Sequence, residues 1–208
     1  MLFNPLGAGI RWAVTESSLK LGDTIVILGC GQRGIAAVIA AKAAGAARII
    51  VTDIERSARK LEVALSIGAD HAIVADKQDV VEEVLRLTGG KLADVVLDVT
   101  SALRPLTDAL LLVRKGGTVV IGGVKGRENA IQLYSDELVL RSITLKGVFT
   151  VDTRAYRQAL DMIAAGTAHQ GAFETQIFSL QRTEEAIHRL AGWDGKDPAI
   201  HVMVDPWA

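Results

Sequence analysis

The 208-residue sequence has a single cysteine, Cys30, and only 4% of its residues are aromatic. One cysteine excludes an internal disulfide and a zinc site built from several cysteines. Lys plus Arg (23) and Asp plus Glu (24) nearly cancel, which argues against a dedicated binder of nucleic acid or of anionic membranes. Apolar stretches such as Ile35–Ala41 are far shorter than the ~20 residues of a membrane span, and the first residues lack the features of a secretory signal. These absences predict a cytoplasmic protein without membrane or nucleic-acid partners.

What the sequence does contain is an alternation of short β-branched segments with Ala- and Leu-rich helical ones. We expect strands at Thr24–Leu28, Arg48–Thr52, His71–Val74, Val95–Asp98, Thr118–Ile121 and Ile143–Val148. Between them we expect helices at Arg33–Ala44, Arg56–Ile67, Asp79–Leu87, Leu103–Val113 and Tyr134–Leu140. Strands that are apolar throughout are typical of a sheet covered on both faces, and their alternation with helices indicates βαβ units. The sequence therefore predicts an α/β protein with a doubly wound parallel sheet (Rossmann fold) of about six strands, with helices on both faces.

Directly after the first predicted strand lies a G-x-G-x-x-G motif formed by Gly29, Gly31 and Gly34. In such a motif the first glycine allows a tight turn, the second lets the backbone approach a pyrophosphate, and the third lets the helix pack on the strand. Gln32 and Arg33 open the helix, whose N-terminus offers free N–H groups to phosphates. The strand before the motif and the helix after it are the context that a dinucleotide-binding loop requires.

A carboxylate at the end of the second predicted strand points to the same kind of ligand. Asp53 follows Gly29 by 24 residues, close to the ~20 expected for the acid that binds the ribose hydroxyls. A carboxylate there accepts bonds from both hydroxyls and repels a 2′-phosphate, which favours NAD(H) over NADP(H). Ile54 and Arg56 follow as further candidate cofactor-binding residues, and a solvated helix face is the alternative interpretation of Arg56.

The rest of the chain is expected to extend this domain. Residues 1–22 are predicted to form a lead-in segment with a helix near Gly7–Ser18, and residues 23–150 the dinucleotide-binding core. Residues 151–208 are expected to pack on the same domain as helices near Thr153–Ala165 and Thr183–Leu190, followed by a return strand at Ile200–Val204.

Other classes of enzyme fit the sequence less well. An S-adenosylmethionine-dependent methyltransferase has a similar glycine loop, but it usually carries an acidic residue in or just before that loop. The segment Ile25–Leu28 has none, and Gly34 favours a dinucleotide. The Tyr/Lys pair of short-chain dehydrogenases is absent, because leucine stands four residues after both Tyr134 and Tyr156.

Together with two later segments, the glycine loop resembles the cofactor-binding domain of the zinc-type medium-chain dehydrogenases, such as the alcohol, sorbitol and threonine dehydrogenases. The segments are Ile67–His71 and Val113–Gly123, and the resemblance runs from about Asn4 to Pro206. It implies NAD(H) binding for hydride transfer between the nicotinamide and an alcohol or carbonyl carbon. The N-terminal GroES-like catalytic domain of this family, which carries most zinc ligands and the proton relay, is expected to be absent from the sequence.

The resemblance also implies cofactor contacts after the later strands. After the fourth strand they lie near the adenosine side or the nicotinamide ribose, and after the fifth and sixth strands near the nicotinamide and its carboxamide. The residues concerned are Val99, Thr100, Gly123, Val124, Val148, Phe149 and Thr150.

Two positions depart from the pattern of the family. Arg33 stands where a small apolar residue commonly braces the nicotinamide, so that this arginine either reaches a phosphate or turns to solvent. Asn4 stands where sorbitol and threonine dehydrogenases have a glutamate ligand of the catalytic zinc, and an amide oxygen is a poor zinc ligand. The histidines have no metal-ligand spacing and are interpreted as surface or packing residues: His71, His169, His188 and His201. We therefore expect neither catalytic residues nor a metal site here, although full-length relatives bind zinc.

The function expected from these residues is that of an NAD(H)-binding domain that is not catalytically competent alone. One alternative is a non-enzymatic NAD(H)-responsive module that acts through a partner. Another is a zinc-free enzyme of the quinone-reductase type, which Asn4 supports and Asp53 disfavours, because such relatives usually prefer NADP(H).

Partners are expected at two surfaces. The open apolar edge strand at residues 143–149 is expected to pair with its twin in a homodimer. A missing catalytic domain or partner chain is expected to leave apolar surface exposed near four residues, Leu2, Phe3, Trp12 and Trp207.

Overall fold

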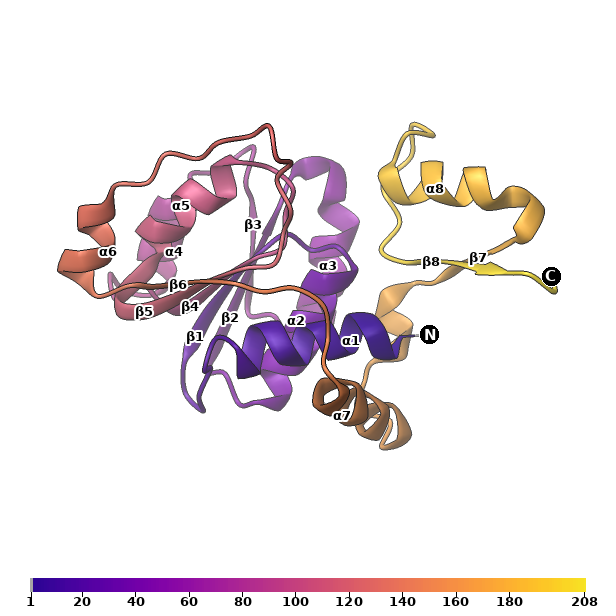
Figure 1. Cartoon of the computed structure of the whole chain (residues 1–208), viewed down its shortest axis with the longest axis horizontal. Helices are drawn as coiled ribbons and strands as arrows, with labels where there is room; N and C mark the ends of the chain where they lie inside the picture. Colours follow the sequence, from indigo (N-terminus) through magenta and orange to yellow (C-terminus); the bar gives the residue numbers. More distant parts are fainter. Residues whose placement is uncertain (1) are drawn as a thin grey trace.

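The structure, a computed structural model, describes residues 2–208, and its main sheet has six parallel strands in the order β3-β2-β1-β4-β5-β6 (Figure 1). The strands are β1 (Thr24–Leu28), β2 (Arg48–Asp53), β3 (His71–Val74), β4 (Ala93–Asp98), β5 (Val113–Ile121) and β6 (Thr144–Gly147). This is the predicted doubly wound (Rossmann) sheet. The strand order reverses between β1 and β4, and ligands of such sheets bind at that reversal, beyond the carboxyl ends of the strands.

Helices cover both faces of this sheet. They are α1 (Phe3–Gly9), α2 (Gln32–Ala43), α3 (Ala58–Ser66), α4 (Val80–Leu87), α5 (Arg104–Leu112), α6 (Ser135–Arg141) and α7 (Thr153–Ala164). Short 3-10 helices lie at Glu55–Ser57 and Gln170–Phe173. The carboxylates of Asp79 and Asp152 accept hydrogen bonds from backbone N–H groups of the first turns of α4 and α7, and so fix where these helices begin.

Alternate residues of the buried strands face opposite sides of the sheet and build two cores. Ile25 and Ile27 of β1 belong to the core that includes α1, α2 and α3. Val26 and Leu28 belong to the core that includes α4 and α5. Figure 1 shows α4 and α5 on one side of the sheet and α1 and α2 on the other. The strands are apolar throughout because neither face is exposed to water.

Two elements begin four or more residues from their predicted start. The N-terminal helix begins at Phe3 rather than Gly7 and continues into a π-helix at Ile10–Thr15, because Pro5 lies in the first turn, where proline is tolerated. β5 begins at Val113 rather than Thr118, because Val113 pairs with Ala93 across a shift in register.

The C-terminal part of the chain forms a second, smaller sheet. β7 (Gln176–Ser179) pairs in parallel with β8 (Val202–Asp205), and α8 (Thr183–Ala191) connects them after a 3-10 turn at Leu180–Arg182. We call β7, α8 and β8 the C-terminal unit, which Figure 1 shows extending to one side of the main sheet. β7 was not predicted, because four residues with polar ends are too short for a periodic pattern. Phe173, just before β7, and Ile200, just before β8, are buried in the main core.

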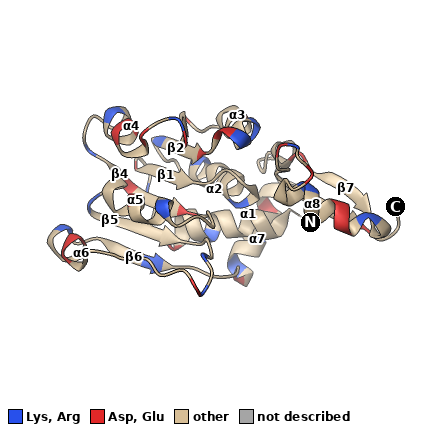
Figure 2. Ribbon diagram, turned by 90° about the horizontal axis from the view of Figure 1, so that it is seen from above, with Lys and Arg blue, Asp and Glu red and all other residues tan. Residues whose placement is uncertain are grey.

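The last features of the fold are the length of its helices and the distribution of its charged residues. No helix within residues 2–208 is long and apolar enough to cross a membrane. Figure 2 shows basic and acidic residues interspersed over the elements.

Candidate functional site

A cavity of about 570 Å³ lies beyond the carboxyl ends of β4, β5 and β6. Its walls come from the segments that follow these strands and from α1, the π-helix, the start of α2 and α7. The lining residues are Asn4, Trp12, Arg33, Val99, Thr100, Ser101, Gly122, Gly123, Val124, Phe149, Thr150, Val151 and Tyr156. We call this hollow the large cavity.

A second, more apolar cavity of about 260 Å³ lies beyond the ends of β1, β2 and β3. It is lined by Leu28, Thr52, Ile54, Ala75, Asp76, Val80, Ala102, Arg104, Pro105 and Asp108. The segment after β4 borders both hollows, because Thr100 lines the large cavity and Ala102 lines the second. The two cavities therefore lie on opposite halves of the sheet, on either side of the reversal in strand order.

The predicted glycine turn joins β1 to α2. A Cβ on Gly34 would overlap the carbonyl oxygen of Gly29, so the helix packs directly against the turn. At Gly31, the residue before α2, a Cβ would meet no atom within 4 Å, and no side chain caps the helix there. Open space beside uncapped N–H groups at a helix N-terminus is suited to a negatively charged group.

Asp53 lies at the end of β2, next to this turn. Its Oδ2 accepts a hydrogen bond from the N–H of Cys30, and its Oδ1 accepts one from the N–H of Ile54, both at 2.8 Å. Each carboxylate oxygen has a second lone pair for a further donor. Burial lowers the pKa of the Lys60 amine, an effect that the negative charge of Asp53 opposes. Asp53 is thus fixed to the glycine turn and still able to accept hydrogen bonds from a ligand.

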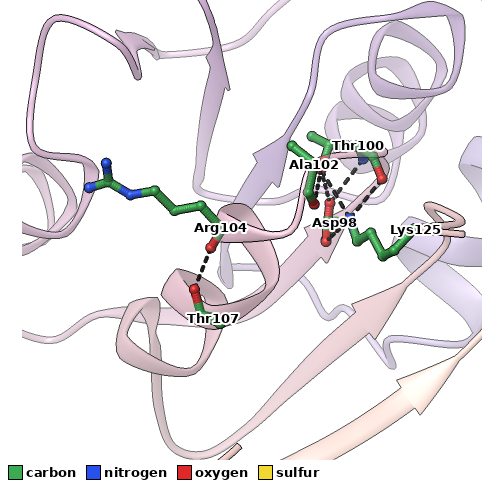
Figure 3. Close-up of polar contacts among 6 residues, drawn as sticks. All are labelled: Asp98, Thr100, Ala102, Arg104, Thr107 and Lys125. Carbon is green, nitrogen blue, oxygen red and sulfur yellow. Dashed lines mark hydrogen bonds and ion pairs between the residues drawn. The ribbon is translucent and has the colours of Figure 1, made fainter. Parts of the chain in front are cut away.

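A buried ion pair supports two walls of the large cavity. Asp98, at the end of β4, is fully buried, and its Oδ2 lies 2.7 Å from Nζ of Lys125. The Thr100 N–H and Oγ1 donate to Asp98 Oδ1 at 2.9 and 2.8 Å, and Lys125 Nζ donates to the Thr100 carbonyl at 2.7 Å. Figure 3 shows this cluster beside the start of α5. It ties the segment after β4 to the segment after β5.

A different group of side chains occupies another part of the large cavity. The Arg33 guanidinium lies over the ring of Trp12, 4.8 Å from the ring centroid. Trp12 is only 3% exposed, and its Nε1 donates to the Thr150 carbonyl at 3.0 Å. Asn4 Nδ2 donates to the Tyr156 hydroxyl oxygen at 2.8 Å. This part of the cavity therefore combines a cation, an indole ring and a phenol.

The structure brings most of the predicted site residues to these hollows. Those that line the large cavity are Arg33, Val99, Thr100, Gly123, Val124, Phe149 and Thr150. Ile54 lines the second cavity, and Gly29, Gly31, Gln32 and Gly34 lie in the turn or the first turn of α2. Val148 instead packs against the main core, and Arg56 donates to the Gly192 carbonyl after α8, and neither side chain lines either of these two cavities.

Several residues of the two hollows were missed by the sequence reasoning. Ser101, Gly122, Val151 and Tyr156 line the large cavity, and Asp76 and Arg104 line the second. The buried Asp98–Lys125 pair lies behind two walls of the large cavity. Asp98 carried a usable signal, since a carboxylate at the end of an apolar strand is costly unless it is paired. Trp12 was predicted to be exposed and is buried, because Gly122 leaves room for its ring.

The residues at the large cavity do not fit a zinc ion. Within residues 2–208, no three His, Cys, Asp or Glu side chains are grouped as metal ligands. Asn4, at the position that the resemblance matches to a zinc-binding glutamate, donates its amide hydrogen to Tyr156.

The chain is similar in sequence and in fold to known dehydrogenases. The zinc-binding dehydrogenase family matches residues 34–165, more than half of the chain. The chain is 39% identical over 208 residues to the "Probable alcohol dehydrogenase adh" of Mycobacterium tuberculosis, covering 99% of this chain and 56% of that protein. It is 34% identical over 205 residues to the sorbitol dehydrogenase of Bacillus subtilis, with the same two coverages. A solved zinc-binding dehydrogenase of Sinorhizobium meliloti 1021, bound to NADP, has a TM-score of 0.85 at 26% identity and matches 98% of this chain and 58% of its own.

The chain spans about half the length of the curated relatives that it matches. The resemblance to the cofactor-binding domain of zinc-type medium-chain dehydrogenases is confirmed, which excludes the methyltransferase alternative. The chain belongs to the zinc-binding dehydrogenase family.

Proposed function

We propose that this chain binds NAD(H) and holds the nicotinamide for hydride transfer to or from an alcohol or carbonyl carbon. The observation that carries the proposal is the turn after β1. There, open space beside Gly31 and the uncapped start of α2 adjoin the Asp53 carboxylate. Cavities on opposite halves of the sheet provide room for the two halves of a dinucleotide.

Each part of the site has a role in this proposal. Gly29, Gly31 and Gln32 face the diphosphate, Gly34 lets α2 pack against the turn, and Asp53 accepts hydrogen bonds from the ribose hydroxyls. Ile54 contacts the adenosine half from the second cavity. The residues that orient the nicotinamide half are those that line the large cavity, Val99, Thr100, Gly123, Val124, Phe149 and Thr150. The bound nicotinamide supplies or accepts the hydride, and the protein supplies its position and surroundings.

The Asp53 carboxylate is expected to make the site prefer NADH over NADPH by at least about tenfold, because it repels a 2′-phosphate and pairs with a free hydroxyl (~1.4 kcal/mol for a factor of ten). Calorimetric titration of the metal-free chain with NADH and then NADPH measures this preference. Asp53→Asn, which removes the charge and keeps the size, is expected to weaken NADH binding and reduce the preference. Asp161→Asn, on the exposed side of α7, is the matched control and is expected to change neither affinity.

Four results of this titration are informative. Micromolar NADH binding with weak NADPH binding supports the proposal. Equal binding of both cofactors contradicts the preference for NAD(H), and stronger NADPH binding points to a zinc-free enzyme of the quinone-reductase type. The NADP-bound relative from Sinorhizobium meliloti makes this comparison necessary. Binding of neither cofactor contradicts the proposed function itself.

We also propose that this chain alone binds the cofactor without turning over alcohols. Hydride transfer to or from an alcohol needs polarisation of the carbonyl oxygen and a route for the proton. Within residues 2–208, no three His, Cys, Asp or Glu side chains are grouped to hold a zinc ion for the first task. A catalytic domain or a partner chain would complete the site, and robust zinc-dependent alcohol oxidation by this chain alone would contradict the proposal.

A non-enzymatic module that responds to NAD(H) and acts in the cytoplasm through a partner is a second candidate. Exposed apolar side chains on the C-terminal unit and the turn after α8 favour it, namely Ile177, Ile187 and Trp193. It predicts that NADH changes the assembly state of the chain or its binding to a partner, a change that the first candidate does not require.

We propose further that the chain is a homodimer through β6. This strand is the edge of the main sheet, and the nearby side chains of Val139, Leu140 and Phe149 are about three-quarters exposed. Light scattering at micromolar concentration is expected to give twice the mass of the chain, and Leu140→Asp is expected to shift it toward the monomer. Leu21→Asp, at a leucine that is even more exposed and lies far from β6 in the chain, is the control. A wild-type monomer would contradict the proposal.

A further inference from the structure

Arg33 is a cation of the large cavity that has no charged partner in the structure. Its guanidinium is half-buried, and no carboxylate within residues 2–208 forms an ion pair with it. Its hydrogen-bond donors are not used within that range either, although a guanidinium carries five N–H groups. Burial lowers the pKa of Arg33, because a charged group loses part of its hydration. Partly buried charges in proteins are usually paired, so this one is suited to a ligand of opposite charge.

Trp12 determines on which side of the cavity the guanidinium lies. Its buried ring packs against Gly122, which follows β5, and its Nε1 is bonded to the Thr150 carbonyl, which follows β6. The guanidinium over this ring is therefore directed toward the β5 and β6 side of the cavity. The proposed diphosphate position is at the Gly29–Gly34 turn, which follows β1. Arg33 thus begins at the diphosphate turn but presents its charge to the half of the cavity that the reacting molecule would share with the nicotinamide.

The neighbouring groups also suit an acceptor ligand. The Tyr156 hydroxyl accepts its hydrogen bond from Asn4, so its own hydrogen remains available to donate. Val124 and Phe149 supply exposed apolar surface on the same cavity. The large cavity therefore offers a hydrogen-bond donor, a cation and apolar surface, and no carboxylate is among its lining residues. This combination favours a small organic anion over a neutral polyol.

We propose that Arg33 binds a carboxylate of the reacting molecule and so makes this site selective for an anionic alcohol or carbonyl compound. The planar guanidinium matches a carboxylate with two parallel hydrogen bonds, and the Trp12 ring beneath it holds the plane in place. This inference rests on the proposed function, because it places the anion beside a bound nicotinamide. The cofactor diphosphate is the other source of an oxyanion, and the experiment separates the two.

The test uses Trp12 as the reporter and oxalate as the probe anion. In a Trp193→Phe/Trp207→Phe background Trp12 is the single tryptophan, and its emission is expected to change as oxalate binds Arg33. The titration is run at constant ionic strength with and without NADH. Arg33→Met is expected to weaken oxalate binding at least about tenfold, because a charge-assisted bidentate contact is lost, and Arg33→Lys is expected to be intermediate. Binding of ADP-ribose, which carries the diphosphate without the nicotinamide, is expected to change less than about threefold.

Arg182→Met is the matched control, because Arg182 also lies over an aromatic ring, that of Phe178, but is paired with Glu185. It is expected to change neither titration. Loss of ADP-ribose binding in Arg33→Met, with oxalate binding unchanged, would assign Arg33 to the diphosphate and overturn the inference. The absence of any oxalate effect on Trp12 would overturn it as well. If NADH and ADP-ribose both fail to bind, the proposed function fails, and the oxalate titration without cofactor still decides whether Arg33 binds an anion.

Discussion

Replacing Lys125 with methionine is expected to lower the free energy of unfolding by about 3–5 kcal/mol, a large part of the 5–15 kcal/mol typical of a small domain. The reason is that Asp98 is fully buried and would lose its charged partner at 2.7 Å. The two hydrogen bonds from Thr100 would remain, but they cannot balance a buried negative charge. Urea denaturation followed by circular dichroism measures the effect.

Two further variants make this prediction specific. Lys115→Met changes an exposed lysine at the other end of β5 and is expected to leave stability unchanged. The double variant Asp98→Asn/Lys125→Met removes both charges and is expected to recover much of the lost stability, because the cost comes from one unpaired charge. If Lys125→Met were as stable as Lys115→Met, the ion pair would not contribute as we argue.

Alanine at Gly34 is expected to destabilise the fold and alanine at Gly31 to leave its stability unchanged, while both weaken cofactor binding. At Gly34 the new Cβ would overlap the Gly29 carbonyl, so the turn and α2 must move apart, at a cost of about 1–3 kcal/mol or more. At Gly31 the backbone is extended and the Cβ would meet open space, so the free energy of unfolding is expected to stay the same. Both variants are expected to bind NADH at least about tenfold more weakly, Gly34→Ala through a distorted turn and Gly31→Ala because its Cβ would occupy the space of the diphosphate.

Thermal unfolding and NADH titration of the same preparations measure both effects. Gly171→Ala in the 3-10 helix at Gln170–Phe173 is the matched control, because its Cβ would also meet open space but far from the turn in the chain. It is expected to change neither quantity. A Gly31→Ala variant with wild-type affinity for NADH would place the diphosphate elsewhere.

Much of the fold was predictable because the sheet is covered on both faces. β1 and β3 lie at the residues predicted for them, since apolar strands bounded by turns and helices leave few alternative positions. β7 was not predictable in this way. It has four residues with polar ends, and its partner β8 lies more than twenty residues further along the chain.

The candidate site also contains residues that the local sequence predicts and residues that depend on contacts between distant segments. Residues that bind through their own backbone or through one side chain next to a turn, such as Gly31 and Asp53, are recognisable from local sequence, because strand, turn and helix are adjacent in the chain. The Asp98–Lys125 pair joins residues on different strand ends, and the stack of Arg33 on Trp12 joins two helices. Neither has a local pattern that predicts it.

The sequence by itself determined the parallel sheet, the position of the glycine turn and the carboxylate beside it, because hydrophobic periodicity and glycine geometry act over a few residues. Only the tertiary structure decided that Trp12 is buried, that Arg56 contacts the C-terminal unit, and that Arg33 lies in the large cavity with no carboxylate partner among residues 2–208. These features depend on which distant segments pack together. Burial and charge pairing, which give the side chains their chemistry, are set by that packing.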